Sequence, residues 1–158
     1  MRILIDTNVL ISAIIGYGTP YRAYVKAVTY PHTAILCDQN VSELQRIFAR
    51  KFPQKIPAME HFLQLTYEAI ELVAVPEQMI PAEQQIRDAA DRPILRAAYA
   101  AKVDVLLTGD KDFLASGLTT PRILPPQSFC GCRREVHALQ PQQRFLLVEP
   151  ARIAREAA

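Results

Sequence analysis

Short apolar runs alternate along the chain with longer segments in which apolar residues recur every three or four positions. The short runs end at polar residues and are typical of buried parallel strands; they lie at residues 3–5, 34–37, 105–108 and 122–124. The periodic segments are typical of amphipathic helices; they cover residues 8–15, 21–28, 39–50 and 58–72, with a further helix opening at residue 91. Strands that alternate with helices predict a three-layer α/β/α fold around a central parallel sheet.

Local signals refine three of these elements. Asp38 follows the second strand and is a good N-cap for the helix over 39–50. Asp91, placed just before Arg92-Pro93, is a standard start signal for a helix. Residues 72–75 are expected to end the helix over 58–72 as an extended stretch.

Acidic residues follow the predicted strands. In parallel sheets, ligands bind beyond the carboxyl ends of the strands. Asp6 follows the first strand directly, and Asp110 follows the strand over 105–108. Asp91 begins the helix that leads into that strand, and Glu43 lies one turn into the helix after the second strand. The four acids are therefore expected at one rim, the carboxyl rim of the sheet.

Each acid also has an ordinary structural explanation. Asp6 and Asp91 could cap the helices that follow them, Asp110 could form a turn, and Glu43 could face solvent. Gathered at one rim, though, carboxylates repel one another, and a bound divalent cation removes that repulsion. Oxygen ligands of this kind suit Mg²⁺ or Mn²⁺, and such ions can activate water for attack on a phosphate. The three histidines are not needed as a base and are expected at surface or packing positions.

Composition narrows the class of protein. The 158 residues, half of them hydrophobic, allow one domain with a short tail. The formal charge of +2 does not mark a strongly basic nucleic-acid binder. Three cysteines and an N-terminus without the plan of a signal peptide favour a reducing, cytoplasmic setting. No run reaches the ~18 apolar residues that a membrane span requires.

The C-terminal residues differ in composition from the rest of the chain. Residues 127–158 follow the pair Pro125-Pro126, contain three glutamines near position 140 and the basic pair Arg133-Arg134, and are expected to form an appendage. Within it, 145–148 is a candidate edge or partner-binding strand and 151–158 a candidate short helix. Cys130 and Cys132 could form half of a zinc site, but a second pair of ligands is missing, so ordinary thiols are the better interpretation.

Four blocks of sequence resemble the PIN-domain (PilT N-terminal) family, in particular the VapC-like ribonuclease toxins of toxin–antitoxin pairs. The first is residues 3–10, a hydrophobic strand followed by Asp-Thr-Asn. The second is Ser42-Glu43-Leu44, and the third is 87–94, in which the spacing to Ile94 places the match on Asp91. The fourth is residues 107–114, matched on Asp110, and 122–129 resembles the closing strand of the family.

The resemblance implies both an activity and an organisation. It covers about residues 1–129, a PIN-like nuclease domain, and leaves 130–158 as an extension of unknown role. It implies an endoribonuclease that uses Mg²⁺ or Mn²⁺ to hydrolyse RNA, is inhibited by a cognate antitoxin, and forms a homodimer or higher oligomer. By the same resemblance the metal ligands would be Asp6, Glu43, Asp91 and Asp110, with Asp112 as an additional ligand. The side chains that orient them or their waters would be Thr7, Asn8 and Thr108.

Two alternatives stay open at this point. A PIN domain that has lost activity could still serve as an RNA- or partner-binding module. A haloacid-dehalogenase-like phosphatase also begins with a strand that ends in Asp and has a later Gly-Asp pair. That enzyme needs a second Asp two residues after the first, where this chain has Asn8, and it leaves Glu43 without a role. It would also form a phosphoenzyme, which a hydrolytic nuclease does not.

Overall fold

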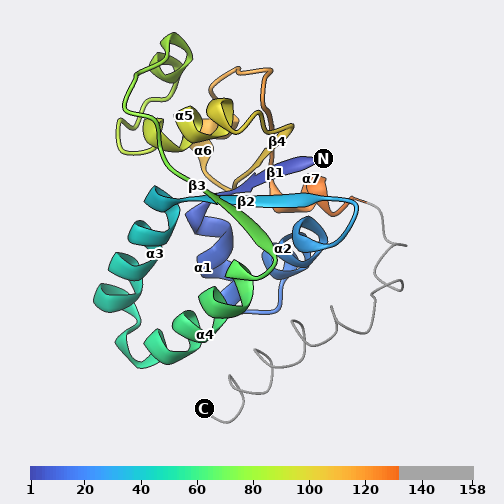
Figure 1. Cartoon of the computed structure of the whole chain (residues 1–158), viewed down its shortest axis with the longest axis vertical. Helices are drawn as coiled ribbons and strands as arrows, with labels where there is room; N and C mark the ends of the chain where they lie inside the picture. Colours follow the sequence, from blue (N-terminus) through green and yellow to red (C-terminus); the bar gives the residue numbers. More distant parts are fainter. Residues whose placement is uncertain (132–158) are drawn as a thin grey trace.

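A five-stranded parallel sheet forms the centre of the computed structural model, which describes residues 1–131 (Figure 1). The strand order is β3-β2-β1-β4-β5, and every neighbouring pair is parallel. The strands are β1 (Arg2–Ile5), β2 (Thr33–Cys37), β3 (Ile70–Val73), β4 (Val105–Leu107) and β5 (Arg122–Leu124). β1, β2, β4 and β5 each lie within a residue or two of the runs expected from the sequence.

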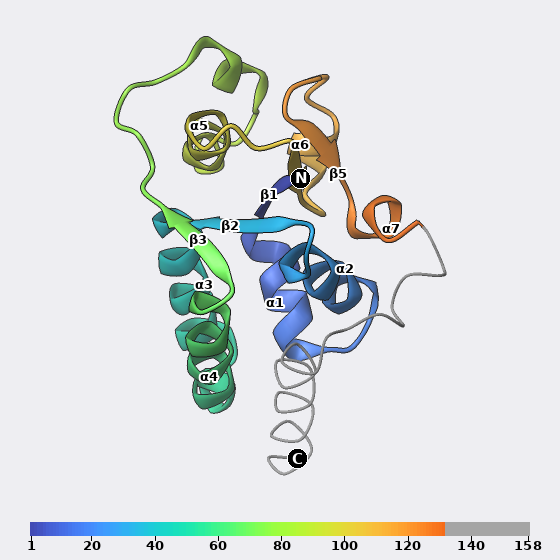
Figure 2. The same ribbon diagram turned by 45° about the vertical axis from the view of Figure 1, so that its right-hand side comes forward.

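Helices cover both faces of the sheet, as the alternation of elements predicts (Figure 2). One face carries α1 (Thr7–Ile15), α2 (Thr19–Val28), α3 (Asp38–Lys51), α4 (Ile56–Tyr67) and α7 (Pro126–Phe129). The other carries α5 (Arg92–Ala100) and α6 (Lys111–Leu114). Two short 3₁₀ helices, η1 (Pro53–Lys55) and η2 (Pro81–Gln85), lie in the connections. The three-layer α/β/α fold is confirmed.

Alternation along β1 divides the core between the two faces. Ile3 and Ile5 pack with α1 to α4, and Leu4 between them packs with α5 and α6. All three side chains are fully buried. Burial on both faces explains why the strand is apolar throughout rather than alternating with polar residues.

Strand order places a functional position between β1 and β4. From β1 the chain passes through α1 and α2 to β2 on one side, whereas from β3 it crosses through α5 to β4 on the other. Such a reversal opens a crevice at the carboxyl ends of the two central strands, where α/β proteins bind ligands. Asp6 and Asp110 follow these two strands.

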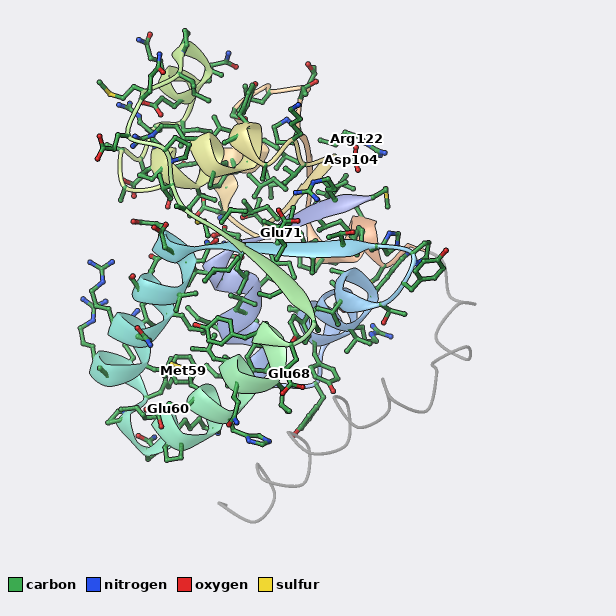
Figure 3. The ribbon with its side chains drawn as sticks, viewed as in Figure 1. Met59, Glu60, Glu68, Glu71, Asp104 and Arg122 are labelled. Atoms are coloured by element: carbon green, nitrogen blue, oxygen red, sulfur yellow. The ribbon has the colours of Figure 1, made fainter. Side chains whose placement is uncertain are left out.

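Charged side chains are arranged differently at the amino and carboxyl ends of the strands. At the amino-terminal edge, Arg2 pairs with Glu71 at 2.9 Å, and its backbone N–H donates to Asp104 at 2.7 Å. Figure 3 shows Glu71 and Asp104 there, with Arg122 beside Asp104. The acids of this edge are therefore matched by arginine, which the carboxyl rim described below does not repeat.

The helix expected over 58–72 ends early, and this expectation was wrong for its last turn. α4 stops at Tyr67, and β3 pairs with β2 from Ile70 onward. Before the end of the helix, the hydroxyl of Thr66 donates to the carbonyl of Phe62 and also bonds the Tyr24 hydroxyl at 2.7 Å. Helical periodicity continues past Tyr67 in sequence, but pairing with β2 takes over those residues.

Asp38 is not the N-cap of α3, contrary to expectation. The cap is Cys37, and the side chain of Asn40 accepts hydrogen bonds from the Cys37 backbone N–H at 3.1 Å and thiol at 3.0 Å. The Asp38 carboxylate instead accepts from the backbone N–H groups of Gln39 and Val75. The helix starts without a linker because β2 runs directly into it.

The folded domain extends a few residues into the segment that was expected to form an appendage. Residues 126–129 form α7, and Phe129 is buried in the core beside α2. The candidate strand 145–148, the candidate helix 151–158 and Cys132 lie outside the described residues. Across residues 1–131, no helix is both long and apolar enough to cross a membrane.

Candidate functional site

Asp6 is the most constrained acid of the carboxyl rim. Its side chain is only 4% exposed, and its backbone N–H donates to the Leu107 carbonyl at 3.0 Å, which ties the end of β1 to β4. One carboxylate oxygen accepts from the Thr7 backbone N–H at 2.7 Å. The other accepts from the Asn8 amide at 2.7 Å and from the Thr108 hydroxyl at 2.5 Å.

Burial raises the pKa of Asp6 to about 6. The hydrogen bonds from Thr108 and Thr7 act in the opposite direction, because they stabilise the ionised form. The charges of Glu43 and Asp110 raise the pKa further. Asp6 is therefore a helix cap, as its ordinary explanation holds, and also a carboxylate that lies in the field of two other acids.

Asn8 and Thr108 join the start of α1 to the turn after β4. The Asn8 amide donates to Thr108 at 3.2 Å and accepts from the Gly109 N–H at 3.0 Å. The Thr108 hydroxyl accepts from the Asp110 N–H at 2.9 Å. Thr108 is fully buried. This network fixes the turn that carries Asp110, whose own carboxylate caps α6 by accepting from the Asp112 N–H at 2.7 Å.

Asp91 occupies the N-cap position of α5 but makes no capping hydrogen bond. Burial raises its pKa to about 7, and the charges of Asp6, Asp110, Asp88 and Glu43 add to the effect in that order. Asp91 therefore occupies a capping position without capping the helix through its carboxylate. That carboxylate is instead close enough to the other acids of the rim to be affected by their charges.

The loop before Asp91 is anchored by arginine side chains. Arg92 Nε donates to the Ile86 carbonyl at 3.1 Å. Arg96, one turn into α5, pairs with the buried Glu83 at 2.9 Å and donates to the carbonyl of Pro76 at 2.9 Å. These contacts hold the start of α5 against the sheet and so determine where Asp91 lies.

Glu43 is half-buried on α3, and a residue that the sequence did not single out anchors its helix. The fully buried Asn40 donates from its amide to the Thr7 hydroxyl at 3.2 Å while its oxygen caps α3 through Cys37. This links α3 to the start of α1, directly beside Asp6. One signal in the sequence could have identified it. Asn40 lies on the same helical face as Leu44 and Phe48, so its side chain could be expected in the core, where a polar group needs hydrogen-bond partners.

Asp112 has a different neighbour from the other acids. Its carboxylate forms an ion pair with Arg87, at 2.8 Å to Nη2 and 3.3 Å to Nε. The Arg87 side chain is 87% exposed and that of Asp112 is 19% exposed. Asp112 is thus neutralised by arginine, and its charge does not add to that of the rim. Among the described histidines, the His32 ring packs 5.9 Å from the Phe129 ring; His137 lies outside the described residues.

The donors of the rim fit a hard divalent cation in chemistry. Three aspartates and a glutamate supply only oxygen ligands. Burial is the largest cause of the raised pKa values of Asp6 and Asp91, and the charges of neighbouring acids raise both further. Within residues 1–131, no three acidic, histidine or cysteine side chains are grouped closely enough to hold a metal ion as they stand. The acids are near enough to repel, and their side chains stand apart.

The chain is an α/β protein with a parallel sheet, and its carboxylates lie at the ends of the two central strands, where the strand order reverses. The PIN domain family matches residues 2–112, well over half of the chain. The chain belongs to this family, which confirms the resemblance seen in the sequence. The phosphatase alternative has no support, since Asn8 uses both ends of its amide in binding Asp6, Thr108 and Gly109.

Solved structures agree on the fold. The chain is similar to the crystal structure of VapBC2 from Rickettsia felis bound to a DNA fragment from their promoter. The identity is 16% and the TM-score 0.61, and the match covers 79% of this chain and 98% of that chain. At this identity the likeness establishes the fold. No curated protein matches the chain.

Proposed function

We propose that this PIN domain is a metal-dependent endoribonuclease that hydrolyses RNA phosphodiester bonds and acts as the toxin of a toxin–antitoxin pair. Its catalytic acids are Asp6, Glu43, Asp91 and Asp110. The observation that carries the proposal is the electrostatic coupling of these acids at the crevice between β1 and β4. A structural cluster would be expected to pair such charges with arginine, as the amino-terminal edge does with Arg2.

The proposed role of each acid follows from the hydrogen bonds that position it. Asp6, with three hydrogen bonds to its carboxylate, is the fixed ligand. Asp110 is positioned through Thr108, and Asp91 keeps an uncapped carboxylate directed at the rim's charge. Glu43, on a separate helix, binds the ion or orients the attacking water. Bound Mg²⁺ or Mn²⁺ would supply Lewis acidity that activates water and stabilises charge on the phosphate.

The biological setting follows from the same proposal. The VapBC2 structure contains a toxin–antitoxin complex, and we extend that arrangement to this chain as a cognate antitoxin partner. A homodimer or higher oligomer and a cytoplasmic location belong to the proposal as well. The alternative, an inactive PIN domain that binds RNA or a partner, is separated from it by activity.

Cleavage of a mixed single-stranded RNA panel tests the proposal. The full chain is incubated with Mn²⁺ or with EDTA, and Asp6→Asn is compared with the wild type. Glu60→Gln serves as a matched control, because Glu60 is an exposed acid on α4 (Figure 3). We expect cleavage that EDTA abolishes, that Asp6→Asn reduces by about 100-fold or more, and that Glu60→Gln leaves unchanged.

Full activity of Asp6→Asn in Mn²⁺ would exclude the assigned site. A folded wild type that binds Mn²⁺ and cuts no RNA of the panel would instead favour the inactive binding module.

A further inference from the structure

A groove of about 650 Å³ leads away from the acidic rim. Its lining includes Asn8, Gly109 and Asp110, all of which belong to the network around Asp6. It also includes residues 125–127, where α7 begins. Its volume lies within the ~300–1,000 Å³ typical of pockets for small organic groups. Because Asp110 lines the groove, a ligand bound in it lies beside the acidic rim.

The walls of the groove are apolar and stiff. They include Val9, Pro20, Leu114, Pro125 and Pro126. Three of these are prolines, whose rings fix the backbone and lose little freedom when a ligand binds. Such a surface suits the flat face of a nucleobase. The described part of the lining contains no aromatic side chain, so the base would pack against proline and aliphatic groups.

Two uncharged polar side chains enter the groove with their hydrogen-bonding capacity unused. Ser12 lies on α1 and Gln127 on α7, and both are exposed. Neither side chain makes a hydrogen bond to another residue of 1–131. The amide of Asn8, in contrast, is fully engaged by Asp6, Thr108 and Gly109. A hydroxyl and a carboxamide can each donate and accept, which is what the edge of a base requires.

The groove carries positive side chains beside its acids. Lys111 and Arg87 line it together with Asp110 and Asp112. Arg87 is held by Asp112, whereas Lys111 is exposed at the start of α6, next to Asp110. A phosphate adjoining a nucleotide in the groove would meet Lys111.

We propose that the groove binds one unpaired nucleotide beside the scissile bond, with Ser12 and Gln127 selecting its base and Lys111 binding an adjacent phosphate. The inference rests on the proposed function and deepens it by assigning base selection to named residues. A single splayed base can present its Watson–Crick edge to these side chains, whereas in a duplex that edge is occupied by pairing. The favoured occupant is RNA rather than a partner peptide because the groove shares Asp110 with the acidic rim.

The first measurement is the cleavage pattern on a randomised single-stranded RNA library, read by sequencing the cut ends in Mn²⁺. Variants are Ser12→Ala, Gln127→Leu and Lys111→Ala, with Gln64→Leu, an exposed glutamine on α4, as the matched control. Thermal unfolding checks that each variant is folded. We expect the wild type to prefer certain bases at one position beside the cut. Ser12→Ala and Gln127→Leu should reduce that preference about fivefold or more at the same position, and Gln64→Leu should keep it.

The second measurement is binding of fluorescent single-stranded and duplex RNA to Asp6→Asn protein at several salt concentrations. Adding Lys111→Ala should weaken binding of single strands of every sequence and reduce the slope of log K against log salt by about 0.7. Duplex RNA should bind more weakly than single strands throughout.

These outcomes separate the groove from the nuclease itself. Unchanged base preference and an unchanged salt slope in the variants would overturn the groove assignment while cleavage still stood. If the wild type cut no RNA, the nuclease proposal would fail, and binding alone would decide: retained single-strand binding lost in Lys111→Ala and Gln127→Leu supports the groove, and no binding overturns it. Variants that lose only binding of a partner protein would make the groove a peptide site and would overturn the assignment too.

Discussion

At the scale of single residues, the site depends on how a buried carboxylate is kept ionised. Asp6 loses solvent almost completely, and its compensation comes from hydrogen-bond donors that surround it. Thr108 is central among these, because its hydroxyl donates to Asp6 while accepting from the N–H of Asp110. One side chain therefore positions two of the four acids.

Replacing Thr108 tests this dependence. Thr108→Val keeps the shape of the side chain and removes the hydroxyl, so the pKa of Asp6 should rise and the Asp110 turn should lose its anchor. We expect Mn²⁺ affinity at pH 7, measured by titration calorimetry, to fall by about 10- to 100-fold. Thr119→Val, at an exposed threonine, is the control. Wild-type affinity in Thr108→Val would show that the hydroxyl is structural only.

Sequence was informative about where the acids lie in the fold and silent about their partners. Asp6 and Asp110 could be placed because each directly follows a buried strand, and strand ends meet at one rim. The pairing of Asp112 with Arg87 could not be foreseen, because it joins residues 25 positions apart across two loops. Whether these acids hold metal stays a prediction.

At the scale of elements, α3 is oriented by one buried amide. Asn40 connects the end of β2, the start of α3 and the start of α1 through Cys37 and Thr7. Glu43 is carried by that helix, three residues further on. The position of Glu43 relative to Asp6 therefore follows from Asn40 rather than from any contact of its own.

Asn40→Ala leaves the buried N–H of Cys37 and the hydroxyl of Thr7 without this partner. We expect the free energy of unfolding to fall by about 1–3 kcal/mol, measured by urea denaturation. Gln45→Ala, at an exposed position of the same helix, should change it little. An equal loss in both variants would mean that the effect is not specific to the buried amide.

Element types were easier to predict than element ends. The runs around Ile3–Ile5 and Val105–Leu107 are apolar on both faces, which in an alternating chain indicates parallel strands. The end of α4 was missed because periodicity cannot register competition from pairing with β2. The start of α3 was missed because an Asp after a strand looks like a cap, and the side chain that does the work lies three residues later at Asn40.

At the scale of the whole molecule, negative charge is gathered at one rim, and within residues 1–131 none of its four acids forms an ion pair. The pKa of Asp6 is raised from 3.8 to about 6, and that of Asp91 from 3.8 to about 7. A folded state in which acids hold protons more tightly than the unfolded chain is favoured at low pH. The contribution of these two groups is fully present below about pH 4 and is lost as the pH rises through 6 and 7.

The pH dependence of thermal unfolding should show this. In EDTA, we expect the wild type to lose stability between about pH 5 and pH 8 relative to Asp91→Asn, which lacks one of the raised groups. Mn²⁺ should stabilise the wild type more at pH 8 than at pH 5, because protons compete for the ligands. The measurement is a melting curve across pH with and without the ion. Equal stabilisation at both pH values would argue against a carboxylate site.

The layers of the molecule could be predicted, but the neighbours within the sheet could not. Alternating elements imply a parallel sheet with helices on both faces, whereas nothing in the hydrophobic pattern of Ile3–Ile5 says that it lies between β2 and β4. The role of Phe129 in the core was hidden for the same reason, since its partner helix α2 lies about a hundred residues earlier.

The central place of β1 has a consequence for how the protein is made. Asp6 leaves the ribosome 102 positions before Thr108, its hydrogen-bond partner. Contacts of such long sequence separation form late, once the rest of the domain can fold as a unit. A nascent chain that ends before β4 therefore lacks both Thr108 and Asp110, and the carboxyl rim cannot assemble on it. Under the proposed function, activity begins only after β4 and the turn that follows it have been translated.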